Sequence, residues 1–96
     1  MNVKPSPEWQ DWRAIADSLD RMTMQLDDFL RLYPDITREQ LAKIAGCRIA
    51  TVNNWFAEGS THRAPTDAHK MRLAIAHWLK NEPTMFSDIR EVMKDL

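Results

Sequence analysis

Two neighbouring asparagines, Asn53 and Asn54, lie in a short stretch that the sequence predicts to be helical. If Val52 and Trp55 turn inward, steps of about 100° per residue define the opposite, outward side of that helix. The outward residues are Ala50, Asn53, Asn54 and Ala57, with Arg48 at the leading end. An asparagine amide can pair bidentately with adenine, an arginine can reach guanine or a phosphate, and a small alanine can touch a thymine methyl group. This face therefore has the chemistry for reading bases in the major groove of duplex DNA.

Polar residues around this helix suit contacts with a phosphate backbone. They stand at the flank of the helix, at the start of the preceding helix and in the following loop. Hydroxyl, imidazole and guanidinium groups in such places are common phosphate contacts. The predicted phosphate contacts are Thr37, Arg38, Thr51, Ser60, Thr61, His62 and Arg63.

One cysteine and three histidines are the remaining residues with chemistry of their own: Cys47, His62, His69 and His77. There is no C-x-x-C pair, and His69 and His77 are about 80° out of line on a helix, so no metal site is predicted. Cys47 is interpreted as a small buried side chain. The sequence shows no glycine-rich phosphate loop, acid pair or nucleophile–base pair. We therefore expect neither an enzyme nor a cofactor.

Two short helices joined by a tight turn must position the asparagines. Thr37-Arg38-Glu39-Gln40 has the pattern of a capping box, in which the Thr37 hydroxyl and the Gln40 amide serve each other's backbone N–H groups. The helix that it opens should end at Gly46, which can take the left-handed conformation. A second helix should run from about residue 48 to residue 57 and end before Gly59. Leu41, Val52 and Trp55 should seal the space between the two helices, with Ala42 at their closest approach.

Residues 37–59 resemble the helix-turn-helix motif of the lambda-repressor/Cro-like (XRE-type) family, and the resemblance extends more loosely over residues 24–80. It implies that the helix from Arg48 to Ala57 lies in the major groove and that the protein forms a homodimer on two half-sites. Two positions depart from the family pattern. Arg48 stands where an N-capping Ser or Thr is usual, and Phe56 stands where a glutamate is common. Phe56 is interpreted as an additional core residue.

The region before the motif, residues 7–33, carries apolar residues at helical spacing. Ser6-Pro7-Glu8 is a good helix start, with a hydroxyl N-cap, proline at the first position and an acid near the helix dipole. The stripe is interrupted at Thr23, so one long helix and two helices that meet near residues 20–23 both fit. An N-terminal helical extension is expected over about residues 6–22.

Two further helices are predicted after the motif, one opened by Thr66-Asp67 and closed at residues 81–83, and a last one over about residues 84–96. Trp55 and Trp78 are interpreted as core residues. The chain of 96 residues is thus expected to be one all-α domain, residues 1–96, of about five helices with N- and C-terminal helical extensions.

Charge is unevenly distributed along a chain whose net charge is −1. Residues 37–80 have seven basic and three acidic side chains, a net charge of +4, whereas residues 1–36 carry −3 and residues 81–96 carry −2. A positive middle between acidic ends predicts one side that faces a polyanion. The single cysteine and the lack of a long apolar run predict a cytoplasmic, nucleoid-associated protein without a membrane segment.

Two functions fit these observations. The first is a sequence-specific DNA-binding transcriptional regulator, of either sign, that dimerises through its apolar N- or C-terminal stripe. The second is a protein–protein adaptor on the same scaffold, docking through Trp9 and Trp12 or through the C-terminal helix. The acidic ends could also recruit a second protein partner in either case.

Overall fold

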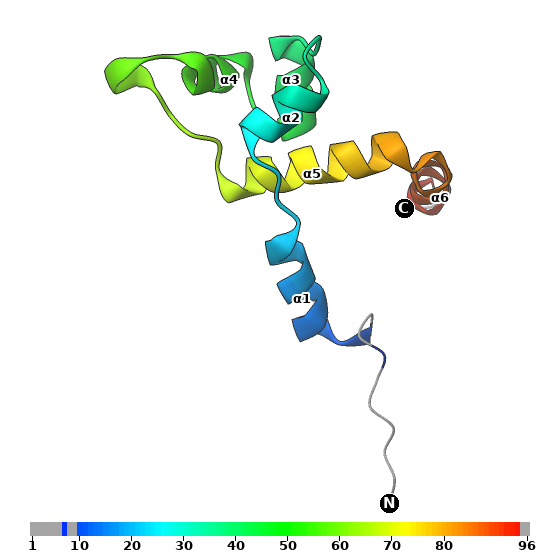
Figure 1. Ribbon diagram of the computed structural model, residues 1–96. Helices are drawn as coiled ribbons and strands as arrows, with labels where there is room; N and C mark the ends of the chain where they lie inside the picture. Colours follow the sequence, from blue (N-terminus) through cyan, green and yellow to red (C-terminus); the bar gives the residue numbers. More distant parts are fainter. Residues whose placement is uncertain (1–6, 8–9, 95–96) are drawn as a thin grey trace, which may run out of the picture.

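The computed structural model describes Pro7 and residues 10–94, and the described part contains helices and no strand (Figure 1). The α-helices are α1 (Trp12–Arg21), α2 (Leu26–Leu32), α3 (Arg38–Ala45), α4 (Ile49–Phe56), α5 (Asp67–Asn81) and α6 (Pro83–Met93). A short 3-10 helix, η2 (Gly59–Thr61), follows α4. The all-α prediction is confirmed. Residues 10–94 form six α-helices instead of the expected five or so because the N-terminal region forms two.

The N-terminal region divides between Arg21 and Leu26, which decides between the two arrangements that the sequence allowed. Residues 22–25 cross to α5, where the Met24 amide donates to the Lys70 carbonyl oxygen at 3.1 Å. α1 begins at Trp12, later than the predicted start, and the Asp11 carboxylate caps it by accepting from the Arg13 amide. Ser6 and Glu8 of the predicted start lie outside the described residues.

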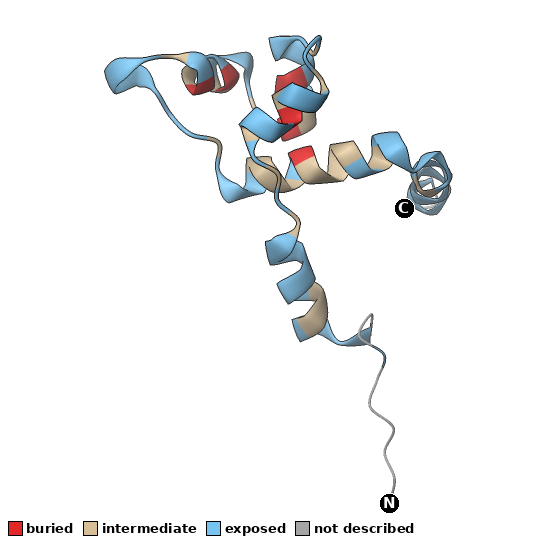
Figure 2. Ribbon diagram, in the orientation of Figure 1, coloured by how far each residue is buried: buried red, intermediate tan, exposed pale blue. Residues whose placement is uncertain are grey.

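The core lies where α2, α3, α4 and α5 meet (Figure 2). Its buried side chains are Phe29, Leu41, Ala42, Ala45, Val52, Trp55 and Leu73. Every helix of this group contributes at least one of them, and α3 packs against both α4 and α5. Leu41, Val52 and Trp55 close the space between α3 and α4 as predicted. The core therefore fixes the position of α4 relative to the rest of the molecule.

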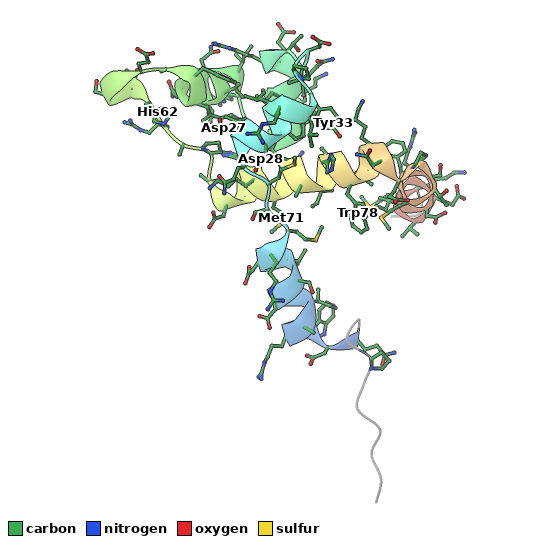
Figure 3. The ribbon with its side chains drawn as sticks, viewed as in Figure 1. Asp27, Asp28, Tyr33, His62, Met71 and Trp78 are labelled. Atoms are coloured by element: carbon green, nitrogen blue, oxygen red, sulfur yellow. The ribbon has the colours of Figure 1, made fainter. Side chains whose placement is uncertain are left out.

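Trp78 was expected in the core, and this is wrong: its side chain is 42% exposed. Figure 3 shows it at the end of α5 that lies next to α6. The last turns of α5 contact the end of α2, because His77 Nδ1 lies 2.7 Å from the Tyr33 hydroxyl and the Lys80 ammonium lies 5.6 Å from the centroid of the Tyr33 ring. Trp78 comes five residues after the buried Leu73, about 140° around the helix, so it lies on a side of α5 that the core helices do not cover.

The C-terminal helix packs against α5, and none of its residues is buried. It begins at Pro83 and ends at Met93, close to the predicted span, and residues 95–96 lie outside the described part. Within that part, every helix is too short or too polar to cross a lipid bilayer.

Candidate nucleic-acid interface

The turn between α3 and α4 consists of Gly46, Cys47 and Arg48. Gly46 has a φ of 74°, the left-handed conformation that the sequence predicted. Its amide donates to the Ala42 carbonyl oxygen at 2.9 Å, and the Cys47 amide donates to the same oxygen at 3.0 Å. These bonds satisfy the C-terminal end of α3 and let α4 begin at Ile49. Two helices joined by a three-residue turn have the form of a helix-turn-helix.

Both ends of α3 are held firmly. The predicted capping box is present: Thr37 Oγ1 accepts from the Gln40 amide at 3.1 Å, and Gln40 Oε1 accepts from the Thr37 amide at 3.0 Å. At the other end, the Arg72 guanidinium of α5 donates from Nε to the Ile44 carbonyl oxygen at 2.8 Å. α3 is therefore a rigid support for the turn and for α4.

The outward face of α4 agrees in part with the prediction. Arg48, Ala50 and Asn53 are exposed, whereas Asn54 and Ala57 are half-buried. The cause is the loop after α4, which folds back onto the end of the helix. The Arg63 amide donates to the Asn54 carbonyl oxygen at 3.0 Å. Asn53 is therefore the more accessible of the two asparagines.

Arg48 is the N-cap of α4, and its side chain makes no capping hydrogen bond. The sequence indicated that α4 lacks a capping side chain, and the structure agrees with this. The first backbone N–H groups of α4 lack a side-chain acceptor in the described structure. Arg48, at this end of the helix, is itself exposed.

Phe56 was interpreted as a core residue, and this is wrong: it is 38% exposed. The guanidinium of Arg38 covers its ring instead, with Cζ at 4.6 Å from the ring centroid. Arg38 Nη1 also donates to Asn53 Oδ1 at 2.9 Å. Phe56 lies on the flank of α4 that faces the start of α3, where a cation and not the apolar core is its neighbour.

Ile49, which the sequence reasoning missed, is 44% exposed in the first turn of α4. It shares a flank with Asn53 and Phe56, four and seven residues further on. The predicted base contacts are polar or small side chains, and Ile49 is neither. The helical spacing from Asn53 was the signal that could have found it.

The predicted phosphate contacts lie on α3, on α4 and in the loop that contains η2. Thr51 is half-buried, and the other six are exposed: Thr37, Arg38, Ser60, Thr61, His62 and Arg63. Hydrogen bonds from its own side chains hold this loop, in which Figure 3 labels His62. Arg63 Nη1 donates to the Ser60 and His62 carbonyl oxygens at 2.9 and 2.7 Å, and His62 Nδ1 donates to the Ala57 carbonyl oxygen at 3.0 Å.

Cys47 is half-buried beside the core, less enclosed than expected. Burial raises the pKa of its thiol, and the nearby positive charge of Arg72 acts in the opposite direction. Such a thiol is a poor nucleophile at neutral pH. Among the residues that the structure describes, no three His, Cys, Asp or Glu side chains are grouped closely enough to hold a metal ion.

A separate hollow of about 580 Å³ lies on the side formed by α2, α3 and α5. Its walls are mainly apolar, with Lys43 and Lys80 among the lining residues. The ammonium group of Lys80 lies 5.6 Å from the centroid of the Tyr33 ring. The hollow is a recess in the surface between these helices.

No family model, curated protein or solved structure matches this chain. The resemblance to the lambda-repressor/Cro-like family therefore stays a prediction from residues 37–59.

Proposed function

We propose that this protein is a sequence-specific transcriptional regulator that binds duplex DNA with α4 in the major groove. The observation that carries the proposal is the outward face of α4. It presents small and amide side chains next to an arginine, and a three-residue turn and a capped α3 hold it in place. An exposed helix of this kind fits the width of the major groove, where base edges differ in their donors and acceptors.

The charges around α4 support the same proposal. Arg38, Arg48 and Arg63 are exposed near its two ends, and the net charge of residues 37–80 is +4. The proposed base contacts are Arg48, Ala50, Asn53, Asn54 and Ala57, and the proposed phosphate contacts are Thr37, Arg38, Thr51, Ser60, Thr61, His62 and Arg63. Such a protein would act in the cytoplasm on the nucleoid.

A titration of fluorescently labelled random duplex DNA, repeated over a series of salt concentrations, tests the proposal. The binding constant should fall as the salt concentration rises. A plot of its logarithm against the logarithm of the salt concentration should have a slope of about −0.9 for each phosphate neutralised. Selection from a random pool should then return a shared sequence. Absence of binding at low salt would refute the proposal.

Ala50→Glu is the variant that tests the placement of α4 in the groove. Ala50 is exposed on α4, so a carboxylate there would meet base edges and phosphates and should weaken DNA binding at least about tenfold. Ala68→Glu is the matched control because Ala68 is also an exposed helical alanine, but on α5. Equal losses of DNA affinity in the two variants would mean that only net charge matters and that α4 does not lie in the major groove.

We also propose that the regulator is a homodimer joined through the end of α5 and through α6. Phe86, Ile89 and Met93 form a stripe on α6, and they are 45%, 43% and 59% exposed. Trp78, in the part of α5 nearest to α6, is also exposed. A patch of this kind is typical of a protein–protein contact. Two copies would bring two α4 helices to half-sites about one DNA turn apart.

Sedimentation equilibrium tests the dimer. Ile89→Glu should give monomers, whereas Ser87→Glu, which adds the same charge to the other side of α6, should leave the dimer intact. A wild-type protein that sediments as a monomer at all concentrations would refute this interface.

A protein–protein adaptor is the second candidate function, and α1 favours it. Trp12 is 82% exposed and no residue of α1 is buried. The acidic N-terminal region would then recruit a protein partner, as it also could in a regulator. Trp9, the other tryptophan of the predicted docking surface, lies outside the described residues. Salt-dependent DNA binding that is unchanged in Trp12→Ala would speak against the adaptor as the main function.

A further inference from the structure

Arg38 connects the two helices of the motif through one side chain. It stands at the first position of α3, and its guanidinium reaches α4. Nη1 donates to Asn53 Oδ1 at 2.9 Å, and Cζ lies 4.6 Å from the centroid of the Phe56 ring. We call this arrangement of Arg38, Asn53 and Phe56 the Arg38 bridge. All three residues are exposed, so solvent and DNA can reach the bridge.

The chemistry of the bridge decides which way the Asn53 amide faces. A guanidinium has only donors, so the group of Asn53 that meets Arg38 must be the carbonyl oxygen. The amide N–H₂ group of Asn53 is then turned away from Arg38. The ring of Phe56 holds the guanidinium by a cation–π contact, which limits its freedom to leave Asn53.

An asparagine held in this way offers a different surface from a free one. Bidentate pairing with adenine needs the amide oxygen as an acceptor and the amide nitrogen as a donor, because adenine presents one acceptor and one donor in the major groove. Guanine presents two acceptors, N7 and O6. Arg38 takes one of the two lone pairs of Asn53 Oδ1, and the positive guanidinium beside that oxygen disfavours the approach of a second donor such as the adenine N6–H₂ group, so Asn53 acts best as a donor.

We propose that Arg38 is a positioning residue that holds Asn53 as a hydrogen-bond donor, so that the base opposite Asn53 is read as guanine in preference to adenine. This inference rests on the proposed DNA-binding function. Of the five guanidinium N–H groups, those not used by Asn53 can donate to a phosphate. Arg38 thus links a backbone contact to the reading of one base.

Selection of bound duplexes from a random pool, carried out with four proteins, tests the proposal. The four are the wild type, Arg38→Met, Arg38→Lys and, as a control, Lys43→Met. Lys43 is exposed on α3 and takes no part in the bridge, so its replacement removes one charge and leaves Asn53 as it was. Thermal unfolding of each variant establishes that it is folded.

The wild type should prefer guanine at one position, and Arg38→Met should move that preference about tenfold toward adenine. Arg38→Lys should show the same shift while its salt dependence stays that of the wild type, because lysine keeps the charge but lacks the planar fork. Lys43→Met should keep the base preference. Asn53→Ala should lose the preference at this position in every background.

Two results would overturn the inference, and they are distinguishable. If Arg38→Met weakens all sequences equally and the base preference is unchanged, Arg38 is only a phosphate contact, although the protein still binds DNA. If the wild type binds no duplex at low salt, the proposed function and this inference both fail. Nuclear magnetic resonance of the Asn53 side-chain amide, without DNA, isolates the bridge itself. Arg38→Met should shift this signal and Lys43→Met should not, and an unchanged signal would refute the bridge.

Discussion

Replacing Gly46 by alanine would disturb the turn in two ways at once. The φ of 74° is a conformation that residues with a Cβ atom adopt at a cost. The added Cβ would also lie 2.8 Å from Nε and 3.0 Å from Cζ of Arg72. Gly59 offers the matched comparison, since its φ is 73° and nothing lies within 4 Å of a Cβ built there.

The expected loss of stability follows from these two positions. Left-handed backbone costs about 1–2 kcal/mol for alanine, and the lower entropy of the unfolded alanine chain returns about 0.4–1 kcal/mol. Gly59→Ala should therefore destabilise by at most about 1.6 kcal/mol. Gly46→Ala must also displace the Arg72 guanidinium, which donates to the Ile44 carbonyl oxygen. A hydrogen bond to a charged group contributes about 1.5–3 kcal/mol, and the exposure of Arg72 favours the lower end, so Gly46→Ala should cost about 2–3 kcal/mol.

Urea unfolding followed by tryptophan fluorescence measures both variants, with Arg72→Ala and the double variant Gly46→Ala/Arg72→Ala completing a thermodynamic cycle. Because Arg72→Ala already removes the displaced group, the double variant should be more stable than additivity predicts by about 1 kcal/mol or more. Equal losses for Gly46→Ala and Gly59→Ala, together with additive behaviour in the cycle, would refute the role assigned to Arg72.

Three more outcomes follow from the structure. Leu73→Ala should lower the free energy of unfolding by about 2–5 kcal/mol because Leu73 is fully buried, whereas the same change at the exposed Leu32 should cost far less; similar losses in urea unfolding would contradict the core described here. Tyr33→Phe should cost about 0.5–1.5 kcal/mol because the hydroxyl lies 2.7 Å from His77 Nδ1, and an unchanged midpoint would show that this bond adds nothing. Burial raises the pKa of Cys47 above 9.0, so iodoacetamide should react more slowly with the native than with the unfolded chain at neutral pH. Because the pKa is higher in the native state, the contribution of the thiol to stability is complete below pH 9.0 and is lost as the pH rises through the native pKa. An alkylation rate of the native chain equal to that of the unfolded chain would refute the raised pKa.

Local chemistry explains what the sequence predicted well. The capping box at Thr37, the left-handed Gly46 and the helix start at Thr66 each depend on residues within four positions of one another, so the sequence alone determines them. The burial of Val52 and Trp55 follows from the same short spacing. This is also why α3, the turn and α4 were predicted almost to the residue.

The predictions that were wrong concern residues whose surroundings depend on contacts between distant parts of the chain. Helical spacing puts Trp78 on an apolar stripe of α5, but it does not say which side of α5 the other helices cover. Phe56 and Asn53 both contact Arg38, which precedes Asn53 by fifteen positions, and no local pattern links them. The half-burial of Asn54 likewise results from the loop that returns to α4.

The lack of any buried residue in α1 has a consequence for how this end of the protein could bind a partner. An isolated helix of ten residues is only marginally stable in water, because helix nucleation is unfavourable and few hydrogen bonds follow it. Residues 12–21 should therefore unfold locally without disturbing the core. A partner that holds α1 as a helix must supply the free energy of ordering it, so that binding is weaker than the contact area alone would suggest and readily reversed. The N-terminal end would thus favour a transient association over a permanent one.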